Sequence, residues 1–299
     1  MRLATFARKG SANLTVGALT EVNGETVLLE VAALNGSFPS TMKELLRDVD
    51  GNFDALAGAV QKASAHAHLR LPEVTLGPVV PDPDKIICIG LNYRDHAAET
   101  NHAVPEVPTV FAKYSNTLIG CGESIQLSAL TDQVDYEAEL AVVIGRRAKN
   151  VSEKDAIEYV AGYSIFNDVS ARDYQLRVSQ WTVGKSFDTF GPFGPCLVTR
   201  DEVSDPHSLG IRLRIGNELL QDSNTRNMVF SVPALIAFLS STMTLNPGDV
   251  IATGTPAGVG FTRKPARFIQ PGEIVEIEID QLGKLWNPVQ GAAGIRAER

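Results

Sequence analysis

Two glutamates lie inside a run of apolar residues that otherwise predicts a buried β-strand. Glu137 and Glu139 are two residues apart in the run from Asp135 to Gly145. Because side chains alternate across a strand, both carboxylates are expected on one face, which Ala141 and Val143 continue towards the interior. Two carboxylates about 5 Å apart repel each other by roughly 3 kcal/mol at an effective dielectric near 20. The fold therefore has to supply a cation or a proton at this place.

A second acidic pattern, near the C-terminus, serves as a comparison. In residues 275–280 apolar and acidic residues alternate strictly, which predicts an ordinary strand with one face in solvent. The residues around Glu137 and Glu139 do not alternate in this way. An alternative stays open for this pair, namely a solvated edge or a location beside Arg or Lys side chains.

Composition limits the kind of partner. The net charge is −8 and no cluster of Lys and Arg is present, so we expect neither a nucleic-acid partner nor a membrane partner, but a small molecule. Three widely spaced cysteines predict reduced thiols, not disulfides or a zinc site. The N-terminus has no long apolar run. We expect a cytoplasmic protein, with the mitochondrial matrix as the alternative if a presequence has been removed.

The order of the predicted elements indicates an α+β protein that is rich in β-strand. A hairpin is predicted around Asn23-Gly24, two helices follow from Thr41 onwards, and later helices are predicted at 153–161 and after Ser231. Short strands with Gly and Pro turns make up most of the rest. The predicted parts are a small N-terminal α+β domain at 1–70, a Pro-rich linker at 71–84, a large domain at 85–290 and a flexible tail at 291–299.

A third carboxylate follows the next predicted strand. Asp168 comes directly after the run Tyr163 to Asn167. Together with Glu137 and Glu139 it would form an all-oxygen site, which suits Mg²⁺, Mn²⁺ or Ca²⁺ far better than zinc or copper. Such an ion, held by three carboxylates, keeps open positions for substrate oxygens and can act as a Lewis acid towards a carbonyl group or an enolate.

A histidine and a glutamate lie three residues apart after the predicted strand at 85–90. In a helical turn His96 and Glu99 would share a face, so that the carboxylate orients the imidazole and raises its basicity. That arrangement is typical of a pair that activates water. The alternative is that His96 only packs beside a turn.

Further polar residues follow the predicted ligand Asp168. Arg172 and Gln175 come soon after it, and Arg is suited to binding a substrate carboxylate. Lys185 lies among small residues; beside a dication its pKa could be lowered, and it could serve as a proton donor or oxyanion partner. The alternative is that Lys185 is a surface lysine in a turn, without a role in the site. The Gly-rich segment at 253–260 predicts either a nest of backbone amides for a carboxylate or carbonyl, or a plain tight turn.

Taken together, these motifs resemble the fumarylacetoacetate hydrolase family. The matching segments are Gly90-Leu91-Asn92-Tyr93 with His96 and Glu99, the strand from Asp135 to Gly145, residues 167–175, residues 184–187 and Thr253-Gly254-Thr255-Pro256. The first 70 residues also resemble the branch of this family called fumarylacetoacetate hydrolase domain-containing protein two. The resemblance implies a β-roll of mixed sheets behind a small N-terminal domain, usually as a homodimer.

The resemblance also implies roles for individual residues. The implied metal ligands are Glu137, Glu139 and Asp168, the implied catalytic residues are His96, Glu99 and Lys185, and the implied substrate contacts are Arg172, Gln175 and Thr255. His96 and Glu99 would lie on a mobile lid. The local position of Glu99 matches the acylpyruvase-like branch, which argues against fumarylacetoacetate as the substrate.

The expected function is that of a divalent-metal-dependent enzyme acting on small 2-oxo or 1,3-dioxo carboxylates through a metal-bound enolate, as an acylpyruvate-type C–C bond hydrolase. Oxaloacetate tautomerase or decarboxylase activity at the same site is one alternative, since it needs the same enolate without an attacking water. A non-catalytic metal- or metabolite-binding protein is the other. Such a protein would not need His96, Glu99 and Lys185, and their presence favours an enzyme.

Overall fold

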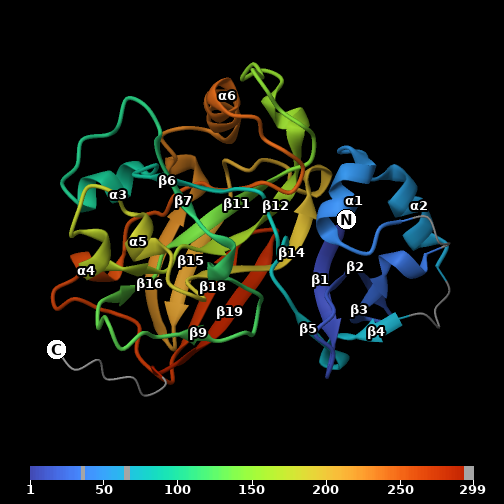
Figure 1. Cartoon of the computed structure of the whole chain (residues 1–299), viewed down its shortest axis with the longest axis horizontal. Helices are drawn as coiled ribbons and strands as arrows, with labels where there is room; N and C mark the ends of the chain where they lie inside the picture. Colours follow the sequence, from blue (N-terminus) through green and yellow to red (C-terminus); the bar gives the residue numbers. More distant parts are fainter. Residues whose placement is uncertain (35–37, 64–67, 293–299) are drawn as a thin grey trace.

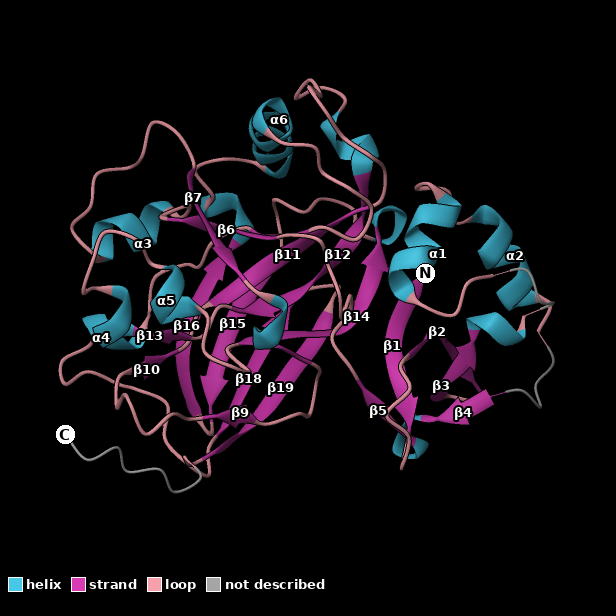
Figure 2. Ribbon diagram, in the orientation of Figure 1, coloured by secondary structure: helices cyan, strands magenta, loops and turns pink. Residues whose placement is uncertain are grey.

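The computed structural model describes residues 1–34, 38–63 and 68–292 and is dominated by β-strands (Figures 1 and 2). A twelve-stranded sheet has the order β4-β3-β2-β1-β14-β12-β11-β17-β6-β7, with β5 beside β1 and β8 beside β14. Its strands are β1 (Arg2–Arg8), β2 (Thr15–Val22), β3 (Glu25–Glu30), β4 (His68–Arg70), β5 (Val74–Leu76), β6 (Ile86–Gly90), β7 (Thr109–Lys113), β8 (Leu118–Ile119), β11 (Ala138–Ile144), β12 (Val160–Asn167), β14 (Gly191–Thr199) and β17 (Val250–Ala252).

A second, five-stranded sheet has the order β16-β15-β18-β19-β9 and packs on β11, β12 and β14 of the first. Its strands are β9 (Ile125–Gln126), β15 (Gly210–Ile215), β16 (Glu218–Asn224), β18 (Ile274–Ile279) and β19 (Gly283–Gln290), and a separate pair is formed by β10 (Val134–Asp135) and β13 (Ser170–Ala171). The alternation predicted for 275–280 is confirmed, because Val275, Ile277 and Ile279 are buried in the core between the sheets. The mixed, β-rich α+β class is confirmed as well.

The helices are short and lie around the sheets (Figure 1). They are α1 (Met42–Val49), α2 (Asp54–Gln61), α3 (Arg94–Glu99), α4 (Arg172–Gln175), α5 (Thr182–Lys185) and α6 (Val232–Thr242). Thr41 caps α1 and Ser231 caps α6, as predicted, each by accepting a backbone N–H bond. No helix in the described ranges is long and apolar enough to cross a membrane.

The hairpin prediction is confirmed, but one helix prediction is wrong. Asn23 and Gly24 have φ of 52° and 82°, the left-handed values that a type I′ turn requires between β2 and β3. Residues 153–161 do not form a helix beyond a short 3₁₀ turn at Ala156–Tyr159. β12 already begins at Val160. Pairing with β11 and burial of its β-branched and aromatic residues outweigh the capping pattern of Ser152 and Asp155, from which the helix was predicted.

Strands from both sides of the predicted domain boundary join one sheet. β1 pairs with β14, and β5, which lies in the predicted linker, pairs with β1. The division into 1–70, 71–84 and 85–290 stays a prediction. Of the predicted tail at 291–299, residues 293–299 lie outside the described part of the chain.

The register of the central strands defines where a site can form. Ala138 at the start of β11 pairs with Asn167 at the end of β12, so the residues just outside these strands, Glu137 and Asp168, are neighbours. The Asp168 N–H donates to the Glu137 carbonyl oxygen across 2.9 Å. β17 runs antiparallel to β11 and parallel to β6, so that the C-terminal ends of β6, β12 and β17 all lie near the start of β11.

Candidate active site

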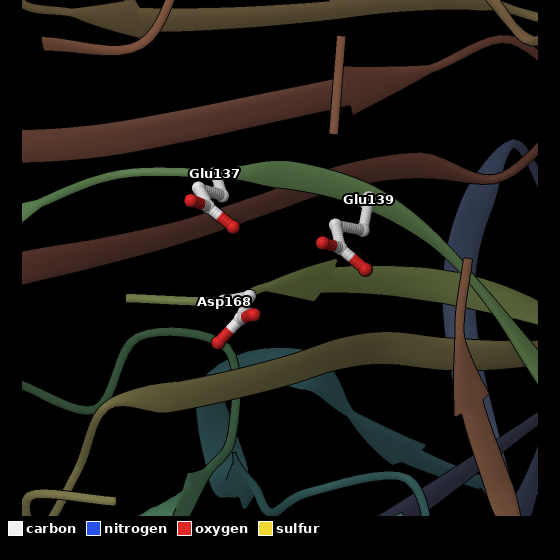
Figure 3. Close-up of side chains that lie close together, drawn as sticks. All are labelled: Glu137, Glu139 and Asp168. Carbon is white, nitrogen blue, oxygen red and sulfur yellow. The ribbon is translucent and has the colours of Figure 1, made fainter. Parts of the chain in front are cut away.

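Three carboxylates converge at this end of the sheet, as predicted (Figure 3). Glu137, Glu139 and Asp168 each have a carboxylate oxygen within 4.8 Å of the others. All three residues are buried, with exposed fractions of 5%, 1% and 0%. The strand is shorter than the sequence suggested, because β11 starts at Ala138 and Glu137 precedes it. The alternative of a solvated edge is excluded by this burial.

Cationic side chains surround two of the three carboxylates. The Lys185 Nζ atom lies 2.7 Å from Glu137 Oε2 and 2.8 Å from Asp168 Oδ2. The other Glu137 oxygen accepts from Arg172 Nη1 at 2.7 Å, and the other Asp168 oxygen accepts from Lys113 Nζ at 2.7 Å. The alternative that these acids lie beside Arg and Lys side chains is therefore confirmed. Lys113 was not predicted from the sequence as one of these partners. Lys113 is the last residue of β7, and nothing in the sequence of this short strand distinguishes a buried lysine from an exposed one.

Glu139 differs from the other two acids. It accepts the backbone N–H of Gly254 at 2.9 Å, and no Lys or Arg in the described ranges pairs with it. Burial raises its pKa well above the usual value, and the charges of Asp168 and Glu137 raise it further. The pKa of Glu137, in contrast, falls to about 2, because although burial opposes ionisation, Lys185 and Arg172 favour it more strongly.

The donor set fits a hard divalent cation. Its oxygens are all carboxylate oxygens. With Glu139 ionised, the four buried acids, which include Asp135, would carry one charge more than the three cations Lys113, Arg172 and Lys185 compensate. An ion at this place would share oxygens with Lys185. The pKa of Lys185 is raised, since the charges of Asp168 and Glu137 outweigh the effect of its burial. In the metal-free site this lysine is therefore an ammonium donor, and the lowered pKa beside a bound dication stays a prediction.

A cavity of about 140 Å³ opens beside the carboxylates. It brings most of the predicted site residues together. The predicted residues that line it are His96, Glu137, Glu139, Arg172, Gln175, Lys185 and Thr255, and the other lining residues are Ile89, Gly90, Leu91, Thr100, His102, Phe111, Leu176, Trp181 and Phe261. Asp168 and Glu99, the other two predicted site residues, are not among the residues that line it.

His96 and Glu99 form the predicted helical pair on α3. The His96 Nδ1 atom lies 3.4 Å from Glu99 Oε2. Glu99 is held from the other side by the Gly258 N–H at 3.0 Å and by the Thr262 hydroxyl at 2.8 Å. Burial raises the pKa of Glu99, but the hydrogen bonds from His96 and Thr262 lower it more, so the net shift is downward. The carboxylate is thereby held ionised beside the imidazole.

Arg172 is anchored within the site. Its Nε donates to Asp135 at 2.8 Å, and its Nη1 donates to Glu137 and to Gln175 Oε1 at 2.8 Å. The guanidinium carbon lies 4.5 Å from the centre of the Phe261 ring. Its Nη2 atom is buried and has no hydrogen-bond partner. A buried donor without a partner is costly, and Arg172 is one of the residues that line the cavity, so its guanidinium group is suited to an anionic ligand.

The Gly-rich segment forms the predicted nest, but it binds carboxylates of the chain itself. Its backbone amides donate to Glu139 from Gly254, to Glu99 from Gly258 and to Asp135 from Gly260 and Phe261. Thr255, a predicted substrate contact, accepts from the Gln221 side chain at 2.8 Å. The segment therefore fixes the acids around the cavity, and this function of the nest could not be foreseen from its glycine spacing.

Comparison with known proteins decides the family. The family model described as fumarylacetoacetate (FAA) hydrolase C-terminal matches residues 85–290, which is more than half of the chain. The chain belongs to the fumarylacetoacetate hydrolase family. Members of this family include hydrolases, isomerases and tautomerases, and the prediction of an enzyme is confirmed at that level.

Relatives in the fumarylacetoacetate hydrolase family match along almost the whole chain. Oxaloacetate tautomerase fahd2, mitochondrial, of Xenopus laevis is 44% identical over 292 residues, which is 97% of this chain and 90% of the relative. The fumarylacetoacetate hydrolase domain-containing protein 2 homolog of Dictyostelium discoideum is 42% identical, with 97% of each chain covered. The branch predicted from the first 70 residues is therefore confirmed.

A solved structure from the family provides a comparison for the metal. The crystal structure of maleylpyruvate hydrolase from Sphingobium sp. SYK-6, in complex with manganese(II) ion and pyruvate, has a TM-score of 0.80 and 32% identity, with 98% of this chain and 100% of that chain covered. It supports the prediction of a divalent ion in this fold, without distinguishing Mg²⁺ from Mn²⁺ or Ca²⁺. The individual roles of the nine predicted site residues stay predictions.

Proposed function

We propose that this protein is a divalent-metal-dependent enzyme that acts on small 2-oxo acids, and that its reaction is the interconversion of the keto and enol forms of oxaloacetate. The observation that carries this proposal is the buried cluster of Glu137, Glu139 and Asp168 beside a cavity with cationic donors. The relative named oxaloacetate tautomerase, at 44% identity, supports the choice of substrate.

The three carboxylates would hold the ion. A dication bound there supplies Lewis acidity, which draws electron density from the keto and carboxylate oxygens of a 2-oxo acid. Of the three carboxylates, Glu139 would gain most from the positive charge of this ion, since no cationic side chain in the described ranges pairs with it. Mg²⁺ and Mn²⁺ are the ions that we propose, and Ca²⁺ would fit the same oxygen ligands.

The polar residues of the cavity would orient the substrate. Arg172 has its Nη2 donor free to bind a substrate carboxylate, while Asp135 and Glu137 hold the rest of its guanidinium group in place. Lys185 is a buried ammonium group that lines the cavity, and its Nζ proton is available to an oxygen that gains negative charge as the enolate forms. His96 is the group that would accept or return the proton at C3.

A second candidate reaction is the hydrolysis of acylpyruvates, which the pairing of His96 with Glu99 favours. Glu99 accepts from Gly258 and Thr262, so its carboxylate is fixed and can orient the imidazole. An imidazole held in this way can remove a proton from a water molecule that attacks the distal carbonyl carbon. The two reactions share the same head-group contacts and differ in whether water attacks.

One assay tests both candidates. Enolic oxaloacetate and an acylpyruvate are each mixed with the protein and Mg²⁺ or Mn²⁺, and the loss of enol absorbance is followed. We expect rapid, metal-dependent exchange of oxaloacetate, and a fall of at least about 100-fold in kcat/KM for Asp168→Asn. Asp173→Asn is the matched control, because Asp173 is a partly buried acid on α4 that contacts Thr131 and Arg177 and lies outside the cluster. Exchange that persists in chelator would contradict the proposal.

Two further properties stay proposals. We expect a homodimer, as the family resemblance implies. The cytoplasmic location predicted from the sequence has no support from the relatives, whereas the mitochondrial alternative agrees with the printed names of those from Xenopus laevis and Homo sapiens. The small-molecule partner agrees with the chemistry of the cavity.

A further inference from the structure

The segment 172–185 gives the cavity a charged inner end and an apolar mouth. α4 begins at Arg172, which is buried, and leads outwards to Leu176, which is 64% exposed. α5 leads back inwards, from Trp181 just before it to the buried Lys185 at its end. The two turns lie side by side (Figure 1), and a Cβ on Gly184 would lie 2.4 Å from the Gln175 nitrogen, so only glycine permits this approach.

The Trp181 indole packs closely against Gly90 and Phe111 at the mouth of the cavity. A Cβ added to Gly90, at the end of β6, would lie 2.3 Å from the Trp181 ring, so the missing side chain of Gly90 makes room for the indole. On another side the indole meets Phe111 edge-on, with ring centres 5.5 Å apart. The Phe111 ring lies in turn 5.3 Å from Lys185 Nζ. Phe111 thus separates the indole from the charged end.

The charged groups of the cavity wall lie at its inner end. Of the lining residues, the permanent cations are Arg172 and Lys185, and both are already bound to the buried acids. At the mouth, Leu91, Leu176 and Trp181 present hydrocarbon, and the ionisable group there is the imidazole of the exposed His102. A ligand carboxylate at the mouth would lose bound water without gaining a strongly charged partner. An apolar group there would instead gain contacts with these hydrocarbon side chains.

We propose that Trp181 is a specificity-determining residue that selects an uncharged hydrocarbon group on the far side of the 2-oxo acid. This inference rests on the proposed function, in which the inner end binds the 2-oxo acid head. Oxaloacetate is short, so its second carboxylate stays near the inner cations. A longer diacid would place that carboxylate against Trp181 and Leu176.

Three ligands distinguish the contribution of the 2-oxo acid head group to affinity from that of the chain attached to it. Pyruvate contains the head alone, 2-oxohexanoate adds three methylenes, and 2-oxoadipate has the same six carbons with a carboxylate in place of the terminal methyl. Their binding to the full chain in the presence of Mn²⁺ is measured by calorimetry. We expect 2-oxohexanoate to bind roughly tenfold more tightly than pyruvate, since each methylene is only partly buried at an open mouth. We expect 2-oxoadipate to bind at least about tenfold more weakly than 2-oxohexanoate.

Variants of Trp181 test whether the indole causes the preference for 2-oxohexanoate. In Trp181→Ala, 2-oxohexanoate should lose most of its advantage while pyruvate changes by less than about twofold. Trp181→Arg should reverse the preference towards 2-oxoadipate, and it keeps the test decisive if the alanine variant does not fold. Trp286→Ala is the matched control, because Trp286 lies on β19 outside the cavity, and it should leave all three affinities unchanged.

The outcomes distinguish the two proposals. If pyruvate binds but 2-oxoadipate binds as tightly as 2-oxohexanoate, or if Trp181→Ala weakens pyruvate and 2-oxohexanoate equally, the role of Trp181 is overturned and the proposed function stands. If wild-type protein with Mn²⁺ does not bind pyruvate at all, both are overturned. Selective loss of 2-oxohexanoate affinity in Trp181→Ala supports the inference.

Discussion

The ammonium nitrogen of Lys185 lies 2.7 Å from a carboxylate oxygen of Glu137, with both side chains buried. This contact divides the acidic cluster into two parts. Glu137 is held ionised by Lys185 and Arg172, whereas Glu139, two residues further on, has a raised pKa and no such partner. The protein therefore compensates most of the charge by itself and leaves one buried acid for which a dication is the natural counter-charge.

Replacing Glu139 should separate metal binding from stability. We expect Glu139→Gln to weaken Mn²⁺ binding by at least about 100-fold and to stabilise the metal-free protein, because a buried amide needs neither a proton nor a counter-charge. Calorimetric titration with Mn²⁺ and urea unfolding of metal-free protein measure the two effects. Glu276→Gln, on the half-solvated face of β18, is the control and should change neither. A destabilised, metal-free Glu139→Gln protein would contradict the absence of a counter-charge for Glu139.

The raised pKa of Glu139 predicts how pH acts on the metal-free protein. A carboxyl group with a raised pKa in the folded state binds its proton more tightly there than in the unfolded chain, so its contribution to stability is lost as the pH rises above the unfolded value towards the folded pKa. Mn²⁺ affinity should change in the opposite sense and increase with pH. Unfolding and Mn²⁺ titrations across this interval measure both. If Glu139→Gln retained the same pH dependence, the titrating group would have to be another residue.

Lys113 should be essential for the metal-free fold. Its ammonium group is fully buried, pairs with Asp168 at 2.7 Å and donates to the Val169 carbonyl oxygen. We expect Lys113→Met to cost about 3–5 kcal/mol, because it leaves Asp168 as a buried carboxylate with one cation fewer. Added Mn²⁺ should restore part of that loss. Chemical unfolding with and without Mn²⁺ measures this, and Lys284→Met, in an exposed pair with Glu276, is the control that should change little. A neutral effect of Lys113→Met would contradict our view of the charge compensation.

His96 should matter more for hydrolysis than for enol–keto exchange. For His96→Ala we expect the hydrolysis of an acylpyruvate to fall by about 10²- to 10⁴-fold, the usual contribution of a general base. The exchange of oxaloacetate should fall by less, because it needs no attacking water and solvent can replace His96 in the transfer of the C3 proton. Both rates are measured with the same metal-loaded protein, and His207→Ala is the control, since His207 lies outside the cavity and accepts the Val232 N–H. Equal losses in both reactions would remove the distinction between them.

The acidic cluster could be predicted from the sequence because its geometry follows from local rules. Two acids in an apolar strand-like run had to be buried, and Asp168 follows the strand that pairs with this run. The pairing of His96 with Glu99 depends only on the three-residue spacing of a helical turn. For these residues, local periodicity and strand order were sufficient.

The charge compensation could not be predicted in this way. Lys113 reaches Asp168 from β7 and Asp135 reaches the Gly260 amide from β10, and both contacts join residues that are far apart in the chain. No sequence period encodes such a contact, since it depends on how sheets and loops pack. The helix expected at 153–161 failed for a related reason, because pairing of β12 with β11 outweighed a capping pattern at Ser152.

The most direct test of the central claim is to count bound ions. Metal-free protein is titrated with Mn²⁺, and free Mn²⁺ is followed by electron paramagnetic resonance, for the wild type, Asp168→Asn and Asp173→Asn. We predict one tightly bound ion per chain in the wild type and in Asp173→Asn, and a loss of at least about 100-fold in affinity in Asp168→Asn. A wild-type protein without a saturable Mn²⁺ site, or an Asp168→Asn variant that binds Mn²⁺ as well as the wild type, would contradict the account.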